Sequence, residues 1–228
     1  TGAIIRGDRS RKQLHLMFSG DTYADGSDEI LAVLEKYGIK GSFFFTGNFY
    51  RNKNFSSFIK KAKDQGHYLG AHSDKHLLYN DWENKKLLVS QEEFKTDLKA
   101  NYEEMEKHGI QKEDAKYFLP PYEWNDEIIT QWADQMDITL INYSPGTLSH
   151  ADYTTPKMEN YKSTDTILQS ILTFEENEGM NGFMLLSHIG TDPDRTDKFY
   201  KKLNQLISTL KERGYEFVAL EKLMELKN

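Results

Sequence analysis

Short apolar runs alternate with amphipathic helical patterns along the chain, and this alternation strongly restricts how it can fold. Seven runs have the length and composition of strands: 14–18, 41–47, 67–72, 115–122, 138–144, 182–188 and 215–220. Six segments between them have helical apolar spacing: 27–38, 54–66, 91–109, 125–136, 163–179 and 198–214. Such alternation predicts an α/β fold with a parallel sheet and helices outside it. About seven units of this kind predict an incomplete (β/α) barrel.

Segment 27–38 carries signals for both ends of a helix. Ser27 is expected to be the N-cap, and Asp28 and Glu29 place negative charge in the first turn. Gly38 is expected to end the helix in a left-handed conformation.

Length and charge restrict the class of protein. The 228 residues contain no linker-like stretch, so one domain spanning residues 1–228 is predicted. The net charge of -7 argues against non-specific binding to nucleic acid or anionic membranes. Since the chain has no cysteine, disulfides and thiol chemistry are excluded. No apolar run approaches the roughly 20 residues of a membrane span.

Polar side chains follow several predicted strands, where a (β/α) barrel carries its active site. The stretch LHLMFSGD ends in Asp21, and GAHSDKH contains His72 and His76. If the latter segment turns into a helix, the four-residue spacing places both imidazoles on one face, which suits a divalent ion. The alternative is a pair of surface or structural histidines, and the small residues Gly70 and Ala71 at the strand end favour the metal site.

Two further strand ends carry candidate groups. In FLPPYEW, two prolines stiffen the turn before Tyr122, whose backbone N–H is a candidate oxyanion donor. The alternative is a rigid turn with an aromatic plug. MLLSHIG ends in His188, which is a candidate general acid or, alternatively, a buried core histidine.

Taken together, these residues resemble the polysaccharide deacetylases with a NodB homology domain, carbohydrate esterase family 4. GHYLGAHSDKH is similar to the family's metal-binding motif, LPPY to its R-x-P-Y motif and LLSH to its L-x-H motif. The resemblance implies a distorted (β/α) barrel with about seven parallel strands. It also implies metal-dependent hydrolysis of N- or O-acetyl groups on a glycan, and export to the periplasm, cell surface or exterior.

The resemblance also implies roles for individual residues. His72 and His76 would bind the metal ion, and His188 would protonate the leaving group. Tyr122 would supply the oxyanion-stabilising N–H. Zn²⁺ is the first expectation for imidazole and carboxylate ligands, although cobalt, nickel or iron would also fit.

The first motif of the family, T-F-D-D, differs in this sequence. Ser19 and Gly20 stand where the family has its general base and a metal-binding aspartate. A one-residue insertion aligns Asp21 with the metal-binding aspartate, so Asp21 is expected to be the third ligand, with Asp25 as the alternative. Leu119 replaces an arginine that contacts the base, and losing both groups avoids a stranded buried charge.

Other carboxylates are candidates for the missing base. Asp21 is one, and four more lie near the motifs: Asp25, Asp74, Glu123 and Asp152. The place of the fourth family motif is taken by INYSPGTLSHADY, which offers polar and aromatic side chains: Tyr143, His150, Asp152 and Tyr153. Tyr122, Trp124 and Tyr143 are expected to stack on sugar rings.

Three functions are compatible with these residues. The first is a metal-dependent carbohydrate deacetylase acting on an acetylated glycan. The second is a glycan-binding domain that keeps the metal and the groove but has lost catalysis. The third is a barrel hydrolase acting on another C–N bond. The retained His188 favours an enzyme, whereas the loss of the aspartate and arginine favours the binding domain.

Overall fold

The computed structural model describes residues 2–225, and contacts divide the chain into two compact units. Unit 1 comprises Thr1–Ile5 and Phe43–Asn142, and unit 2 comprises Arg6–Ser42 and Tyr143–Asn228. The single domain 1–228 stays a prediction, and its ends, residues 1 and 226–228, lie outside the described residues.

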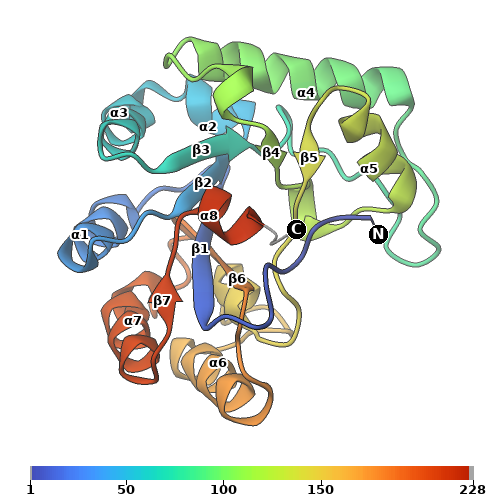
Figure 1. Cartoon of the computed structure of the whole chain (residues 1–228). Coiled ribbons are helices and arrows are strands. Elements are labelled where there is room, and N and C mark those ends of the chain that lie inside the picture. The colour runs from blue at the N-terminus through green and yellow to red at the C-terminus, as the bar shows by residue number, and fades with distance from the viewer. Residues whose placement is uncertain (1, 226–228) are drawn as a thin grey trace. The chain divides into compact units, whose positions relative to one another are not determined.

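All seven predicted strands are present in the described residues (Figure 1). They are β1 (Gln13–Gly20), β2 (Ser42–Phe45), β3 (Tyr68–Ala71), β4 (Tyr117–Phe118), β5 (Thr139–Leu140), β6 (Phe183–His188) and β7 (Glu216–Phe217). Most strand residues are buried, as expected of strands covered on both faces. The α/β class with parallel strands is therefore confirmed.

The six predicted helices also form, with shorter bounds. They are α1 (Ser27–Tyr37), α3 (Ser56–Asp64), α4 (Gln91–Glu106), α5 (Glu127–Asp134), α6 (Thr164–Glu178) and α7 (Leu203–Glu212). Two five-residue helices, α2 (Gly47–Arg51) and α8 (Leu220–Met224), are too short to produce a periodic pattern in the sequence.

The predicted N-cap of α1 is wrong, because Gly26 and not Ser27 occupies that position. The backbone N–H of Gly26 donates to the carbonyl oxygen of Ile189 at 2.9 Å. A Cβ at residue 26 would lie 2.7 Å from that same oxygen, so only glycine fits. Gly38 ends the helix with φ 64°, as predicted.

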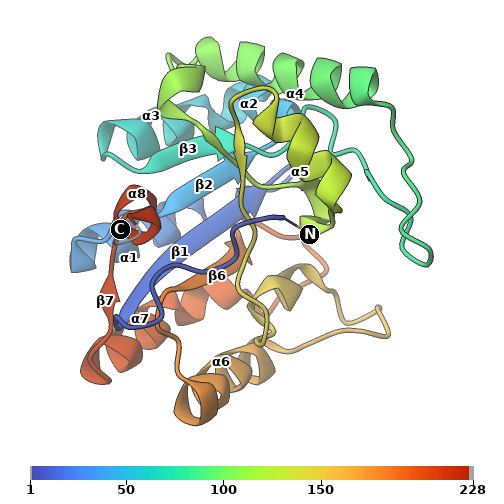
Figure 2. The same ribbon diagram turned by 45° about the vertical axis from the view of Figure 1, so that its right-hand side comes forward.

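In unit 1 the strands follow the order β5-β4-β3-β2. β3 and β4 pair in parallel at Ala71 and Phe118, and β4 and β5 pair in parallel over two residues. The ends of β3 and β4 carry His72 and the Pro120–Pro121 turn. The long loop 72–90 connects β3 with α4 (Figure 2).

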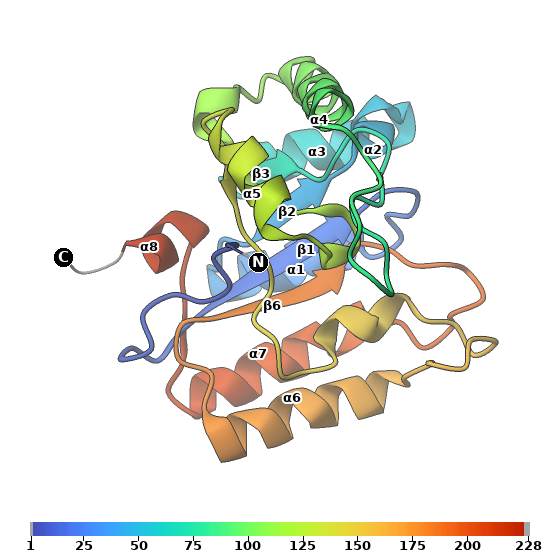
Figure 3. The same ribbon diagram turned by 90° about the vertical axis from the view of Figure 1, so that its right-hand side faces the viewer.

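In unit 2 the strand β1 lies between β7 and β6, and both pairings are parallel. The pairing of β1 with β6 covers six residues and ends with Ser19 opposite His188. The helices α6 and α7 run beside these strands (Figure 3). The register therefore places the residue that follows Phe18 next to the candidate general acid.

None of the helices within residues 2–225 combines the length and the apolar character that crossing a membrane requires.

Candidate active site

His72 and His76 come together in unit 1, although the segment between them is not a helix. Their ring centroids lie 5.0 Å apart. The helix considered after residues 67–72 does not form, because Ser73 and His76 have positive φ angles of 70° and 55°. These left-handed residues turn the loop back on itself, so a tight loop and not a helical face joins the two imidazoles.

The backbone holds the His72 ring in one orientation. Its Nδ1–H donates to the carbonyl oxygen of Leu119 at 2.8 Å, and the ring is almost fully buried. Donation from Nδ1 places the lone pair on Nε2, the arrangement in which a histidine binds a metal ion. Leu119, in the place of the family's arginine, contributes its carbonyl while its apolar side chain is buried.

Helix α4 fixes the loop that carries the histidines through two buried polar residues. Asp97 accepts hydrogen bonds from the Ser73 hydroxyl at 2.6 Å and from the backbone N–H groups of Asp74 and Lys75 at 2.9 and 3.0 Å. One turn later, Oδ1 of Asn101 accepts from the His72 N–H at 2.9 Å. Burial raises the pKa of Asp97, although its hydrogen bonds oppose this shift.

Sequence reasoning missed both Asp97 and Asn101. The signal that could have found them is their position among the apolar residues Phe94, Leu98 and Met105 of α4, since a polar residue on the buried face of a helix needs a specific partner.

Asp74, one of the alternative bases, has a structural partner. Its carboxylate is buried and forms an ion pair with Arg51, with the closest contact at 2.6 Å between Oδ1 and a guanidinium nitrogen. Two guanidinium nitrogens of Arg51 donate to the two carboxylate oxygens, so the Asp74 side chain is fixed in a structural ion pair. The structure therefore disfavours Asp74 as the general base.

The turn after β4 brings Tyr122 to His76. Their ring centroids lie 4.3 Å apart, and Tyr122 is 44% exposed. Tyr122 and Glu123 have φ angles of 57° and 54°, which non-glycine residues rarely adopt. Strain of this kind gathers at functional sites, so it supports a functional role for the turn. The oxyanion-binding role of the Tyr122 N–H stays a prediction.

In unit 2, His188 is held at two points by one carboxylate. Its ring Nδ1 lies 2.6 Å from Oδ1 of Asp152, and its backbone N–H donates to Oδ2 at 2.9 Å. The Asp152 side chain is buried, whereas the His188 side chain is 21% exposed. The sequence offered Asp152 only as a candidate base or motif residue. The structure makes it the partner that orients His188.

Two tyrosines of the segment 141–153 contact histidine rings in unit 2. Tyr143 stacks on His150 with ring centroids 4.6 Å apart, and the Tyr153 ring lies 5.5 Å from that of His188. Burial, together with the nearby His188, lowers the pKa of His150. Since His150 covers one face of Tyr143, only the opposite face could stack on a sugar, and that role stays a prediction.

The end of β1 carries no carboxylate at positions 19 and 20. The Ser19 side chain is buried, and its hydroxyl has no hydrogen-bond partner among residues 2–225. Asp21 is half-buried, and its Oδ2 accepts from the Thr22 hydroxyl at 2.8 Å. A serine cannot act as a carboxylate base, so the substitution at residue 19 removes that chemistry from the strand end.

Asp25, the alternative third ligand, binds three groups of the segment 191–200 in unit 2. Its carboxylate contacts Lys198 Nζ at 3.0 Å, the Tyr200 hydroxyl at 3.0 Å and the backbone N–H of Thr191 at 2.8 Å. Burial acts in the opposite direction, but these contacts lower the pKa of Asp25. With three partners, Asp25 is better explained as a structural anchor than as a metal ligand.

The sequence profile of the polysaccharide deacetylases matches residues 6–141, which is more than half of the chain. The chain belongs to the polysaccharide deacetylase family.

Relatives and solved structures agree with this membership. The peptidoglycan-N-acetylmuramic acid deacetylase PdaA of Bacillus subtilis (strain 168) is 24% identical over 222 residues, which are 97% of this chain and 75% of PdaA. The crystal structure of PdaA, a family 4 carbohydrate esterase, has a TM-score of 0.74 and covers 97% of this chain and 84% of that one.

Two other solved structures have the same fold. A family 4 pseudoenzyme from Bacillus anthracis has a TM-score of 0.76 at 21% identity. The match covers 98% of this chain and 69% of the pseudoenzyme chain. An acetyl xylan esterase from Clostridium thermocellum, solved with a cobalt ion, has a TM-score of 0.70 at 22% identity. The match covers 92% of this chain and 89% of the esterase chain. These likenesses confirm the distorted (β/α) barrel fold of the family.

The described residues fit a metal ion only in part. His72 and His76 offer two imidazoles at close range. However, no group of three or more His, Asp or Glu side chains that could hold a metal is found within residues 2–225. Asp21 belongs to the other unit, so its role as the third ligand stays a prediction from sequence.

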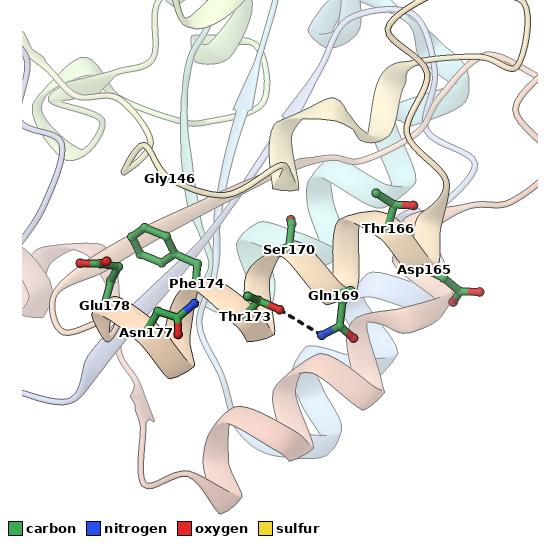
Figure 4. A pocket seen from close by; sticks show the side chains of 9 residues that line it. All are labelled: Gly146, Asp165, Thr166, Gln169, Ser170, Thr173, Phe174, Asn177 and Glu178. Carbon is green, nitrogen blue, oxygen red and sulfur yellow. Dashed lines mark hydrogen bonds between the residues drawn. The ribbon is translucent and has the colours of Figure 1, made fainter.

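A cavity of about 940 Å³ lies along α6, away from all the predicted site residues. Figure 4 shows its lining of mostly polar side chains on one face of the helix, with Phe174 against Gly146. The lining contains no histidine and none of the predicted site residues. The cavity is therefore not part of the candidate active site.

Proposed function

We propose that the chain is a metal-dependent carbohydrate deacetylase that removes N- or O-acetyl groups from a glycan. The observation that carries this proposal is the contact of 2.6 Å between His188 Nδ1 and Asp152 Oδ1. A domain that only binds glycans has no use for an oriented general acid, and a histidine ionises in the range that such an acid needs.

Deacetylation requires that the leaving nitrogen or oxygen receives a proton as the C–N or C–O bond breaks. Asp152 accepts from Nδ1–H and thereby directs Nε2–H of protonated His188 away from the carboxylate. The second hydrogen bond, from the His188 backbone N–H, keeps the carboxylate in place. This pair can therefore donate a proton from a fixed position.

His72 and His76 are the proposed metal ligands, with Zn²⁺ as the first choice. A divalent ion at these imidazoles would supply carbonyl polarisation and would lower the pKa of bound water toward about 7. The hydrogen bond from His72 to Leu119 sets the ring orientation that such binding requires. Asp21 is the third ligand that the sequence suggests.

The absence of a carboxylate at Ser19 and Gly20 predicts slow turnover. Loss of a general base reduces a rate by about 10²–10⁴-fold. Asp21 is the proposed substitute, with Glu123 as the other candidate, because Asp25, Asp74 and Asp152 are each bound by structural partners.

The second candidate function is glycan binding without catalysis. The loss of the general base at Ser19 favours it, together with Leu119 in the place of the arginine that would contact the base. The likeness in fold to a pseudoenzyme is compatible with it.

The proposed substrate is an acetylated glycan of the peptidoglycan or xylan type. The names of the relatives refer to peptidoglycan and xylan deacetylases. Because such glycans lie outside the cytoplasm, we propose export to the periplasm, cell surface or exterior.

The test is acetate release from acetylated peptidoglycan fragments, acetylated xylan and chitooligosaccharides. The protein is stripped of metal and reloaded with Zn²⁺ or Co²⁺, alongside the variants His188→Ala and Asp21→Ala. Metal-dependent release that His188→Ala abolishes supports the deacetylase. Glycan and metal binding without acetate release from any substrate supports the second candidate.

A further inference from the structure

Two exposed aromatic side chains, Trp82 and Tyr122, and the half-buried Trp124 continue the row that begins at His76 in unit 1. The Trp82 ring lies 5.5 Å from that of Tyr122, edge to face, and 5.6 Å from that of Trp124. Tyr122 in turn contacts His76 at 4.3 Å. Trp82 is 53% exposed, and its ring is therefore available to a ligand.

The turn that presents Trp82 is well defined by hydrogen bonds. Oδ1 of Asp81 accepts from the backbone N–H groups of Glu83 and Asn84, both at 3.0 Å. The Asp81 N–H donates to the Lys86 carbonyl at 2.8 Å, and the Lys85 N–H donates to the Asp81 carbonyl at 3.1 Å. A single carboxylate therefore organises the tip of loop 72–90.

A second residue ties this tip to the rest of unit 1. Nδ2 of Asn80 donates to the Lys85 carbonyl at 3.2 Å and to Oδ2 of Asp126 at 3.0 Å. Asp126 caps α5, because its Oδ1 accepts from the Ile129 N–H at 2.9 Å. The position of Trp82 is thus linked to a helix N-terminus, and the ring is preorganised at little further entropic cost on binding.

The aromatic rings of this row, in a chain of the polysaccharide deacetylase family, favour a sugar as the ligand. Tryptophan combines a large apolar face with a polar edge, so it can stack on a ring and also meet water. The C–H faces of a pyranose ring match such a surface. Lys85 Nζ lies over the Trp124 ring at 5.0 Å and covers part of that ring, so Trp82 offers the more accessible face.

We infer that Trp82, supported by Trp124, forms a carbohydrate subsite that binds a sugar ring of the glycan next to the ring held near His76. This inference rests on the proposed function only for the choice of glycan as ligand. It assigns substrate binding to residues 77–90 of this loop, which the sequence motifs leave without a role.

The experiment compares the binding of long and short sugars by isothermal titration calorimetry. The probes are hexa-N-acetylchitohexaose, an acetylated xylohexaose and, for each, the corresponding disaccharide. The variants are Trp82→Ala, Trp82→Phe and the control Leu88→Ala, which removes another half-exposed apolar side chain from the same loop. Circular dichroism verifies that each variant is folded.

Trp82→Ala is expected to weaken hexasaccharide binding about tenfold, which corresponds to about 1.4 kcal/mol. Trp82→Phe should recover part of the affinity, and disaccharide binding and Leu88→Ala should remain near wild type. Equal hexasaccharide affinity of Trp82→Ala and wild type would overturn the inference, as would wild-type protein that binds neither hexasaccharide. Acetate release is measured separately, so Trp82-dependent binding without release would refute only the deacetylase activity.

Discussion

His188 and Asp152 are joined by two hydrogen bonds, one from the ring and one from the backbone of the histidine to the two oxygens of a single carboxylate. Both residues belong to unit 2, whereas the proposed metal ligands His72 and His76 belong to unit 1. The two hydrogen bonds define the orientation of the proposed acid before any substrate binds.

The substitution Asp152→Asn tests this orientation. The amide can still accept from His188 Nδ1–H through its oxygen, but its NH₂ group cannot accept from the backbone N–H. We expect kcat for acetate release to fall by about 10²-fold or more, with little change in KM, because the lost interaction serves proton transfer. The limb of the pH–rate profile that reports the acid should shift, because the negative charge beside the imidazole is removed. An unchanged profile would contradict this role for Asp152.

Asp97→Ala tests how α4 supports the loop that carries His72 and His76, the proposed metal ligands. The substitution leaves the Ser73 hydroxyl and the N–H groups of Asp74 and Lys75 without their buried acceptor. We expect the free energy of unfolding to fall by about 2–4 kcal/mol, since each stranded buried donor costs about 1–3 kcal/mol and the loop relaxes in part. Urea denaturation measures this change.

The control for Asp97→Ala is Glu103→Ala on the same helix. Glu103 is exposed, and its ion pair with Lys99 at 3.8 Å is a surface contact. Glu103→Ala should alter the free energy of unfolding by less than about 0.5 kcal/mol. If Zn²⁺ affinity, measured by competition with a chelator, falls in Asp97→Ala but not in Glu103→Ala, the helix positions the imidazoles. Equal affinities would show that it does not.

Ser19→Asp is expected to raise the rate of acetate release by about tenfold or more, because it places a carboxylate beside His188 in the β1–β6 register. The new carboxylate is buried, so the metal-free protein should also lose about 1–3 kcal/mol of stability. Ser19→Asn has nearly the same shape but offers no base, and it should not gain activity. A similar gain in both variants would mean that shape and not basicity limits turnover.

His15 makes stability depend on pH. The ring is fully buried in unit 2, where Nδ1–H donates to the Val218 carbonyl and the Ser42 hydroxyl donates to Nε2, each at 2.8 Å. Burial lowers the pKa of His15 to about 4, against about 6.5 in the unfolded chain. Below pH 6.5 the unfolded chain binds the proton and the folded protein does not. Stability therefore falls between pH 6.5 and pH 4, by about 3 kcal/mol in total from this residue.

The measurement for His15 is the free energy of unfolding as a function of pH. In His15→Gln the slope between pH 6.5 and 5 should be smaller than in the wild type, whatever its stability at neutral pH. His108→Gln, which replaces a histidine that is only partly buried, serves as the control. The same slope in all three proteins would show that His15 is not the source.

Local pattern was sufficient to predict the strands and longer helices. Buried strands such as β6 are continuous apolar runs, and Gly38 ends α1 because few other residues tolerate its left-handed backbone. The same logic placed His72 and His188 at strand ends, where a parallel α/β fold gathers functional groups. Ser27 shows the limit of this logic, because the close approach of Ile189 to Gly26 decided the cap.

Only the tertiary structure decided which polar groups meet. Asp152 lies 36 residues before its partner His188, and Asp97 lies 24 residues after Ser73. Short-range periodicity carries no information about such pairs, since each depends on how distant segments pack. Packing between distant segments also determines the left-handed backbone angles of His76 and Tyr122. It likewise determines the ring contacts that lead to Trp82. The sequence by itself determined the elements and the strand-end positions, whereas packing between distant segments determined the partners, because side-chain contacts form only after the chain has folded.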